Sequence, residues 1–327
     1  MKSISFLRAN TVSLALEASR QAPDSLFLAG GTTVVDLLRE GVFAPSGVVD
    51  INGLPLREIR VEGSSLMIGA LVSNSELAWN RAVRLLFPIV SEALLSGASG
   101  QIRNMATTGG NLLQRTRCPY YRDLNAGCNR RTPGSGCAAL GGYNRSHAVL
   151  GGSDQCVATH ASDFAVALTA LDAVLMLSGV DGDREVPITE FYAEPGERPE
   201  RETMLRPGEL ITAVRIAHPA PGEKSHYLKV RDRQSFEFAL ASAGVAAELS
   251  HGAMSNVRVA LGGVATVPWR ARSAERLLEG RAPSADLFAS AAEAALAGAR
   301  PLADNAFKIP LAKRVLVKAL HTLASPA

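Results

Sequence analysis

Cysteine and aromatic residues are scarce in this chain, and long apolar runs are missing from it. Four of its 327 residues are cysteines, 5% are aromatic, and the formal net charge is only +3. With 34 basic and 31 acidic residues interspersed along the chain, this balance does not favour nucleic acid or a membrane surface as a partner. No apolar run approaches the roughly 20 residues of a membrane-spanning helix, so we expect no membrane insertion.

A secretory signal is also missing from the start of the chain. The segment "MKSISFLRANTVSLALEASR" has its apolar stretch interrupted by Arg8 and Asn10, and it is typical of a short strand followed by an amphipathic helix. We therefore expect no export on a signal of its own. Export together with a signal-bearing partner stays open.

Hydrophobic periodicity predicts alternating helices and strands at the start of the chain. "SLFLAGG" and "GVVDI" have strand character and "TTVVDLLREG" has helical periodicity, so the first 60 or so residues predict a small βαβ unit. Ser73 and Glu76 have the spacing of a capping box at the start of a later helix. Regular periodicity fades between Gly97 and Gly152, and a structureless span of this length within a compact domain is usually functional or disordered.

The length of 327 residues predicts more than one domain. A plausible linker lies near residue 220, and the strands and then helices beyond it predict a separate α+β domain. We therefore expect an α+β domain over residues 1–220, with subdomains of about 1–60 and 61–220, and a smaller α+β domain over 221–327.

All four cysteines lie within 39 consecutive residues, in a loop at about 114–157. Their spacing is C-x9-C-x8-C-x18-C, at Cys118, Cys128, Cys137 and Cys156. Zinc sites usually contain a tight C-x2–4-C pair, which is missing here. A [4Fe–4S] cluster takes four thiolates at more variable spacing, and a chain of this size has no need of disulfides. The spacing favours a cluster and leaves zinc, disulfides and free thiols open.

Arginines surround these cysteines in the sequence. Near its first three cysteines the loop has one acidic residue, Asp123, and five arginines: Arg115, Arg117, Arg122, Arg130 and Arg131. Positive neighbours lower the pKa of thiols and offset the negative charge of a four-thiolate cluster. We therefore expect thiols of lowered pKa.

Two glycine-rich turns are candidates for phosphate binding. "LAGGTT" at 28–33 joins a strand to a helix, and "TTGGNLL" at 107–113 adds threonine and asparagine side chains. Turns of this kind direct backbone N–H groups at anions, although neither matches G-x-G-x-x-G or a P-loop. Each turn alone is as consistent with a tight bend that binds nothing. Together they suggest a dinucleotide.

Other polar residues have ordinary interpretations from the sequence alone. Asp163 is in place to cap a helix, and Lys229 lies in a strand of alternating polarity where a solvent-facing lysine is expected. The six histidines, His147 and His160 among them, form no metal pair at i, i+4. No acid–base or nucleophile set is recognisable.

The chain as a whole resembles the FAD-binding middle subunits of the molybdenum hydroxylases, the family of xanthine dehydrogenase and aldehyde oxidase. Five segments carry the resemblance in the family's order: "LAGGTTVVDLL", "GASGQIRNMATTGGNLLQRTRCPYYRD", "SDFAVAL", "LRPGEL" and "KVRDRQSFEFALAS". The cysteine loop is most similar to that of bacterial periplasmic aldehyde oxidases, whose flavin subunit carries a [4Fe–4S] cluster. The resemblance implies an α+β fold, with a two-subdomain FAD-binding domain of the vanillyl-alcohol-oxidase type and a smaller C-terminal α+β domain.

The resemblance also assigns residues. One half of the FAD site would be the turn and its flanks, namely Leu26, Phe27, Leu28, Ala29, Gly30, Gly31, Thr32, Thr33 and Val34. The other half would be Thr107, Gly110 and Asn111, with Asp163 on the ribityl or ribose portion and Leu205 and Lys229 near the ends of the cofactor. Cys118, Cys128, Cys137 and Cys156 would bind the [4Fe–4S] cluster.

The implied function is electron transfer. Electrons would come from an aldehyde at a molybdenum-cofactor subunit, pass through [2Fe–2S] clusters on a third subunit and reach FAD here, which would hand them to an acceptor such as dioxygen. The complex would be periplasmic and exported whole, with a cytoplasmic location as the alternative. Three other functions stay open: the flavin subunit of a 4-hydroxybenzoyl-CoA reductase-like enzyme, a self-sufficient flavin oxidase and a zinc-stapled scaffold.

Overall fold

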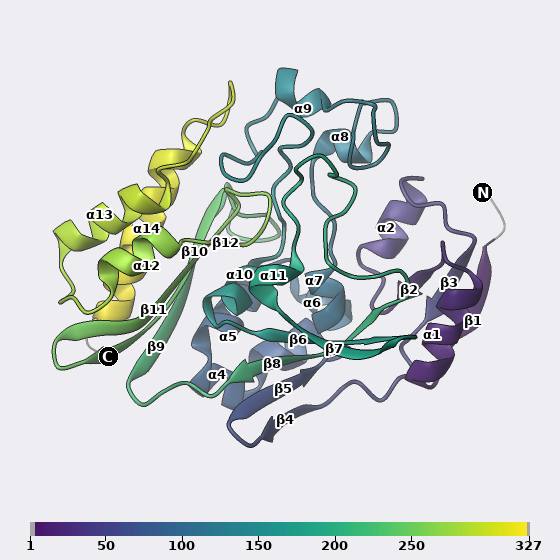
Figure 1. Cartoon of the computed structure of the whole chain (residues 1–327), viewed down its shortest axis with the longest axis horizontal. Helices are drawn as coiled ribbons and strands as arrows, with labels where there is room; N and C mark the ends of the chain where they lie inside the picture. Colours follow the sequence, from purple (N-terminus) through teal and green to yellow (C-terminus); the bar gives the residue numbers. More distant parts are fainter. Residues whose placement is uncertain (1–3, 326–327) are drawn as a thin grey trace.

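The computed structural model describes residues 4–325, whose strands form three separate sheets with helices packed against them (Figure 1). The expected arrangement, a larger mixed α and β region followed by a smaller C-terminal one, is confirmed. Within residues 4–325, no helix has the length and apolar character needed to cross a membrane.

The first sheet is parallel and small. Its strand order is β1-β3-β2, with β3 pairing in parallel with both neighbours. The predicted βαβ unit is therefore confirmed. In chain order its elements are β1 (Ser5–Arg8), α1 (Val12–Gln21), β2 (Leu26–Leu28), α2 (Val34–Arg39) and β3 (Gly47–Asp50).

The second sheet has five antiparallel strands in the order β4-β5-β8-β6-β7, and helices cover one of its faces (Figure 1). The fully buried side chains of Ile89, Phe164 and Leu168 fill the core between them. Its strands are β4 (Ile59–Glu62), β5 (Ser65–Gly69), β6 (Val174–Gly179), β7 (Gly182–Pro187) and β8 (Leu210–Ala217). The helices of this region outside the stretch from Gly97 to Gly152 are α3 (Asn74–Trp79), α4 (Arg81–Leu86), α5 (Pro88–Ser96), α10 (Asp163–Ala170) and α11 (Ile188–Phe191). The predicted capping box of Ser73 and Glu76 opens α3.

The stretch from Gly97 to Gly152 is more regular than its sequence predicts. It contains α6 (Gly100–Met105), α7 (Thr108–Leu112), α8 (Pro119–Arg122) and α9 (Ala138–Gly141). Each is too short to show a 3.6-residue period. Ser99 and Thr107 cap α6 and α7, and a proline opens α8. The expectation of an irregular loop is therefore wrong in part, because local caps start helices that hydrophobic patterning cannot reveal.

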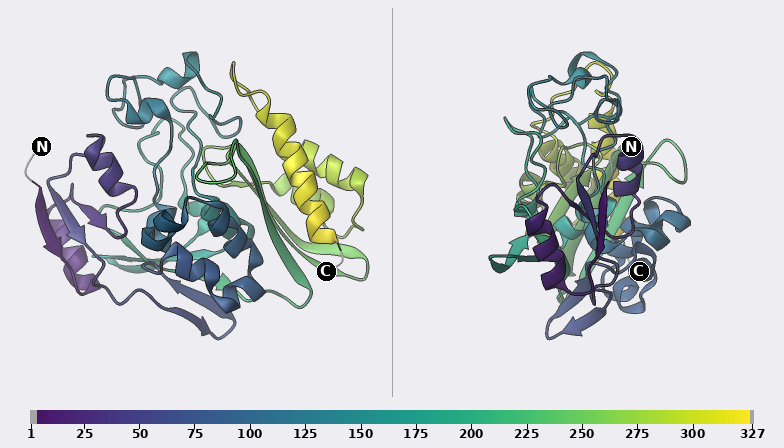
Figure 2. Two further views of the ribbon diagram at one scale, coloured as in Figure 1. Left: turned by 180° about the vertical axis from the view of Figure 1, so that it is seen from behind. Right: turned by 90° about the vertical axis from the view of Figure 1, so that its right-hand side faces the viewer.

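The third sheet is antiparallel, in the order β12-β11-β10-β9, and forms the C-terminal region. Its strands and helices are β9 (Glu223–Val230), β10 (Ala241–Ser250), β11 (Ala253–Gly262), β12 (Trp269–Arg270), α12 (Arg272–Leu278), α13 (Ala285–Ala295) and α14 (Lys308–Ala324). The three helices, drawn in yellow-green and yellow, lie on the outer face of the sheet (Figure 2). The other face packs against α5 and α10 of the preceding region. Since it is covered on both faces, this sheet joins the two regions into one body.

Lys308, the first residue of α14, is fully buried. Its ammonium group donates to the carbonyl oxygens of Ser146 at 3.0 Å and His147 at 2.9 Å. Burial lowers the pKa of Lys308 from 10.5 to about 7. Lys308 thus connects α14 to the cysteine loop, and in the folded protein it loses its proton at a lower pH than in the unfolded chain.

Stability is therefore expected to rise with pH from about 7 to about 10.5, because the unfolded lysine still binds a proton that the folded one has lost. The rise due to this group is on the order of 4 kcal/mol in the free energy of unfolding. Urea denaturation at several pH values in this range gives the free energy of unfolding as a function of pH. That free energy should rise less steeply with pH in Lys308→Met than in the wild type. Lys318→Met, at an exposed position of the same helix, should keep the wild-type slope. Equal slopes in all three proteins would contradict the assignment.

Candidate cofactor sites

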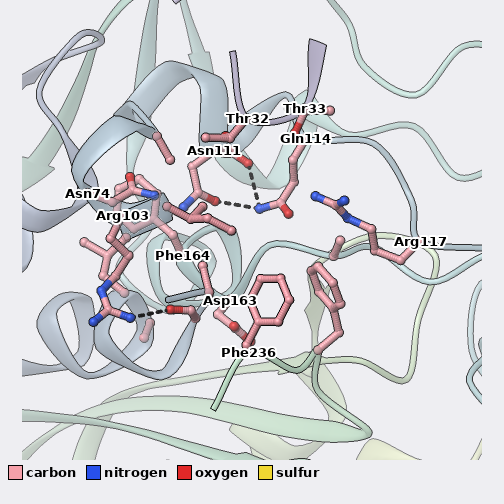
Figure 3. Close-up of a pocket in the computed structure, with 18 of the residues that line it drawn as sticks. Thr32, Thr33, Asn74, Arg103, Asn111, Gln114, Arg117, Asp163, Phe164 and Phe236 are labelled. Carbon is pink, nitrogen blue, oxygen red and sulfur yellow. Dashed lines mark hydrogen bonds between the residues drawn. The ribbon is translucent and has the colours of Figure 1, made fainter. Parts of the chain in front are cut away.

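Two adjoining hollows lie where the N-terminal, middle and C-terminal regions meet. The larger, of about 400 Å³, reaches from α2 to β9, and the smaller, of about 120 Å³, lies between the first sheet, β8 and α7. They share Thr32, Thr33, Ala106 and Gly110 as lining residues. The two hollows therefore form one elongated cleft, and Figure 3 shows the part that contains Thr32, Asn111 and Phe236.

The first glycine turn forms one wall of this cleft at very close range. A Cβ atom at Gly30 would come within 1.7 Å of the carbonyl oxygen of Met105, so only glycine fits there. Gly31 has a φ of +73°, a left-handed value that favours glycine. No side chain caps α2 at Thr33. The backbone N–H of Val35 donates to the carbonyl oxygen of Gly31 at 2.9 Å, and no capping side chain occupies the other leading N–H groups of α2, which a ligand can therefore reach.

The second turn faces the first across the cleft. Thr107 accepts a hydrogen bond from the backbone N–H of Gly110 at 3.2 Å. The amide of Asn111 is held by Gln114, which donates to its Oδ1 at 2.9 Å (Figure 3). Ser162 donates to the same atom at 2.6 Å. The side chains that the sequence singled out are thus fixed before any ligand arrives.

Asp163 and Lys229 form a buried ion pair at the other end of the cleft. The ammonium group of Lys229 lies 2.7 Å from Oδ2 of Asp163, and the hydroxyl of Tyr227 donates to Oδ1 at 2.6 Å. The side chain of Lys229 is only 2% exposed, so the expectation of a solvent-facing lysine is wrong. The helix cap of α10 is Ser162, and Asp163 follows as its first residue.

Most of the residues predicted to bind the cofactor line this cleft. They are Phe27, Ala29, Gly30, Gly31, Thr32, Thr33, Val34, Thr107, Gly110, Asn111, Asp163 and Lys229. Leu26, Leu28 and Leu205 are partly buried and are not part of the lining of either hollow within residues 4–325. Leu205 instead packs against the core of the middle region.

The sequence did not single out several side chains of the same cleft. Arg103, Arg117, Phe236 and Phe238 line its larger hollow (Figure 3). The guanidinium group of Arg117 stacks on the ring of Phe238 at 4.8 Å. Arg117 had been counted only as a neighbour of the cysteines. Arg117 reaches the cleft because the connection between β9 and β10, which carries Phe238, folds against it.

Removal of the lysine of the buried pair tests its role in the cleft. Lys229→Met is expected to lower the free energy of unfolding by about 3–5 kcal/mol, since it leaves the Asp163 carboxylate buried beside an apolar side chain. It should also weaken retention of any ligand bound in the cleft. Thermal unfolding with and without added FAD measures both effects, and Lys318→Met, at an exposed position of α14, is the control. A variant as stable as that control would contradict the pair's importance.

The four cysteines come together around a second, small pocket. Cys118, Cys128, Cys137 and Cys156 all line it, and all four are free thiols. Cys128 and Cys137 also pair through an antiparallel backbone bridge. Disulfides are thus not formed in this structure. Within residues 4–325, no three histidine, cysteine or acidic side chains stand at the distances of ligands to one metal ion.

Arg131 builds the loop between the first two cysteines. Its Nη1 donates to the carbonyl oxygens of Tyr120, Tyr121 and Asp123 at 2.8–2.9 Å, and its Nη2 donates to that of Ala126. One guanidinium group therefore satisfies four backbone acceptors of a segment whose only helix, among the residues that the structure describes, is the short α8. This segment projects above the sheets, near α9 (Figure 1).

The expectation that nearby arginines lower the thiol pKa values is wrong for two of the cysteines. Burial raises the pKa of Cys118 to about 12 and also raises that of Cys137. The arginines have other partners: Arg122 pairs with Asp36 of α2 and with Glu40, the residue that follows this helix, and Arg130 pairs with Glu202. Desolvation of the thiols therefore exceeds the attraction of cations that are already neutralised.

His147 is more than an ordinary polar residue. Its side chain is buried, and its Nε2 lies 3.2 Å from Sγ of Cys118. Burial lowers the pKa of His147 to about 4, so the ring is neutral at pH 7. The sequence offered no signal for this contact because 29 residues separate the two side chains.

Comparison with known proteins identifies the class. The family model "FAD binding domain in molybdopterin dehydrogenase" matches residues 2–219, and "CO dehydrogenase flavoprotein C-terminal domain" matches residues 226–323. The chain therefore belongs to the FAD-binding subunits of the molybdenum hydroxylase family, which are subunits of oxidoreductase complexes.

Individual relatives agree with this class. The chain is 48% identical, over 98% of its length and 98% of the relative's, to the aldehyde oxidoreductase FAD-binding subunit PaoB of Escherichia coli K12. It is 26% identical to the glyceraldehyde dehydrogenase medium chain of Sulfolobus acidocaldarius, over 92% of this chain and 90% of that one. Its fold matches a solved chain of carbon monoxide dehydrogenase from Hydrogenophaga pseudoflava with a TM-score of 0.78 and 26% identity, over 98% of this chain and 97% of that one.

Proposed function

We propose that this chain is the FAD- and [4Fe–4S]-binding electron-transfer subunit of a molybdenum-dependent aldehyde oxidoreductase. It takes electrons from a molybdenum-cofactor subunit through a [2Fe–2S] subunit and passes them to an acceptor such as dioxygen. The observation that carries the proposal is the convergence of all four cysteines on one pocket in a chain that is 48% identical to an aldehyde oxidoreductase subunit.

The cleft fits an extended dinucleotide. FAD accepts electrons singly or in pairs and therefore connects one-electron centres to a two-electron acceptor. The turn at Gly30 brings backbone N–H groups to the cleft wall, and Thr107 and Asn111 line it from the facing turn. These groups suit a pyrophosphate. The pair of Asp163 and Lys229 offers one anionic and one cationic group to the polar edges of the cofactor.

The cysteine pocket offers the ligand set that a four-thiolate cluster takes. All four cysteines of the chain line this one pocket, and a [4Fe–4S] cluster binds through four thiolates. Such a cluster transfers one electron at a time. Binding requires that the thiols lose their protons, and the buried charge of Arg130 at the same pocket favours the thiolates.

The other functions find less support. A 4-hydroxybenzoyl-CoA reductase-like enzyme would use the same cofactors in the reverse direction, but the relatives include oxidoreductases of aldehydes. A self-sufficient flavin oxidase requires a base beside the flavin, and the acidic side chain of Asp163 is already paired with Lys229. We place the complex in the periplasm, on the similarity of the cysteine loop to periplasmic aldehyde oxidases. Cell fractionation tests this location.

Substrate assays on the purified complex test the function. Addition of an aldehyde under anaerobic conditions is expected to bleach the flavin absorbance, and admission of dioxygen should restore it. An aromatic coenzyme A thioester, added to the reduced complex under the same anaerobic conditions, should not be reduced and should leave the flavin bleached. Bleaching by an aldehyde in the isolated chain would instead identify a self-sufficient oxidase, and reduction of the thioester would identify the reductase.

A further inference from the structure

A row of three charged side chains connects the dinucleotide cleft with the cysteine pocket. The guanidinium group of Arg115 lies 2.7 Å from Oε1 of Glu202, and that of Arg130 lies 3.0 Å from Oε2 of the same carboxylate. The exposed fractions of the three side chains are 27% for Arg115, 16% for Glu202 and 6% for Arg130. One shielded carboxylate thus pairs with two arginines on opposite sides.

The two arginines belong to different sites. Arg115 lines the smaller hollow of the cleft, where its guanidinium group also lies over the rings of Phe43 and Tyr121 at 5.7 and 5.6 Å. Arg130 lines the cysteine pocket together with all four thiols. Within the described residues its Nε has no hydrogen-bond partner, which leaves one buried donor beside that pocket.

Arg130 keeps its charge in this environment. Its ion pair with Glu202, at 3.0 Å, compensates for the burial of a guanidinium group that stays protonated in proteins. The group of three therefore carries one net positive charge between two sites, each of which takes up an anion: the pyrophosphate of a dinucleotide and a four-thiolate cluster. Charges this poorly exposed are only weakly screened by salt.

We propose that Glu202 is the shared counter-ion of the two cofactor sites and that it couples FAD binding to the reduction potential of the cysteine centre. The inference rests on the proposed function. Glu202 partly cancels the charge of Arg115 toward FAD and the charge of Arg130 toward the cluster. Any change in this row of charges therefore acts on both sites. Since such coupling is reciprocal, reduction of the cluster also changes the affinity for FAD.

Two substitutions of opposite sign test the proposal in the intact complex. Glu202→Gln removes the negative charge. It is expected to lower the FAD dissociation constant at least threefold and to shift the oxidised-to-reduced ratio of the cluster at a fixed potential about tenfold toward reduction, which is about 59 mV for a one-electron couple. Arg115→Met removes a positive charge on the flavin side alone. It should raise the FAD dissociation constant and lower the cluster potential, although Arg115 does not line the cysteine pocket.

The measurements are FAD titration of the deflavinated complex and a redox titration followed by electron paramagnetic resonance. The control is Glu223→Gln, since Glu223 is a glutamate that is even less exposed, at 6%, and pairs with Arg258 in the C-terminal region. It should leave both quantities unchanged. If Glu202→Gln does not assemble, Arg115→Met is compared with Arg115→Lys, which keeps the positive charge but also alters the packing on Tyr121, a residue that lines the cysteine pocket. A lowered cluster potential in Arg115→Met and not in Arg115→Lys supports the coupling, and equal potentials in the two variants overturn it.

The outcomes separate the inference from the function beneath it. The coupling is overturned if a substitution changes only the FAD dissociation constant or only the cluster potential. It is also overturned if Glu202→Gln and Arg115→Met change these quantities in the same direction. A wild-type complex that contains its cluster and whose variants show wild-type values overturns only the coupling. A wild-type complex without iron at the four cysteines overturns the proposed cluster and this inference with it.

Discussion

Gly30→Ala is expected to raise the FAD dissociation constant by about two orders of magnitude, equivalent to roughly 3 kcal/mol of binding free energy. The new Cβ would lie 1.7 Å from the carbonyl oxygen of Met105, which is backbone and cannot swing aside as a side chain can. Either the first glycine turn or the junction of α6 and α7 must therefore move, and both line the cleft. Flavin content of the purified complex and FAD titration measure the effect.

A neighbouring glycine gives the control for this substitution. Gly100 opens α6, and a Cβ there would meet no atom within 4 Å. Gly100→Ala should retain full flavin content, because alanine favours a helix more than glycine does. If Gly30→Ala held FAD as well as Gly100→Ala, the close approach of the two turns would not form the dinucleotide site.

Arg131→Met is expected to abolish iron binding and to lower the free energy of unfolding by about 3 kcal/mol or more. The substitution leaves four backbone carbonyl groups without their donor, three of them at 2.8–2.9 Å in the native chain. Hydrogen bonds from a charged donor contribute about 1.5–3 kcal/mol each, and those at the exposed end of the loop contribute less. Iron analysis and thermal unfolding of the complex measure the two effects.

A second arginine substitution separates the loss of the hydrogen bonds that shape the loop from the mere loss of a positive charge. Arg60, which pairs with Glu58 and Glu62 on exposed β4, provides a matched arginine, and Arg60→Met should change neither iron content nor stability by a measurable amount. Retention of iron by Arg131→Met would show that the cysteines reach their places without this guanidinium group.

Local patterns in the sequence predicted the parts of this molecule that local physics determines. The βαβ unit follows from hydrophobic periodicity, and the capping box at Ser73 follows from hydrogen-bonding side chains three residues apart. The meeting of the four cysteines around one pocket follows from their placement in a short, glycine-rich segment. Each of these features follows from a pattern that one continuous segment of the chain displays.

Features that depend on distant parts of the chain could not be predicted in this way. The arginines of the cysteine segment seemed unbalanced in sequence, yet Asp36 and Glu40 neutralise Arg122 from 86 and 82 residues away. Lys229 looked solvent-facing until the structure placed Asp163, 66 residues earlier, beside it. Electrostatic partners are set by tertiary contacts, and for this reason the thiol pKa expectation had the wrong sign for Cys118.

An absorbance spectrum of the complex as purified, with FAD, iron, sulfide and zinc assayed on the same sample, tests the account most directly. The account predicts one FAD in the cleft of this chain and, beyond the iron of the partner subunits, about four irons and four sulfides at its cysteines. The additional iron should disappear in a variant with Cys118 and Cys156 replaced by serine, while FAD remains. A wild-type sample with zinc in place of that iron, or one with no flavin, would contradict it.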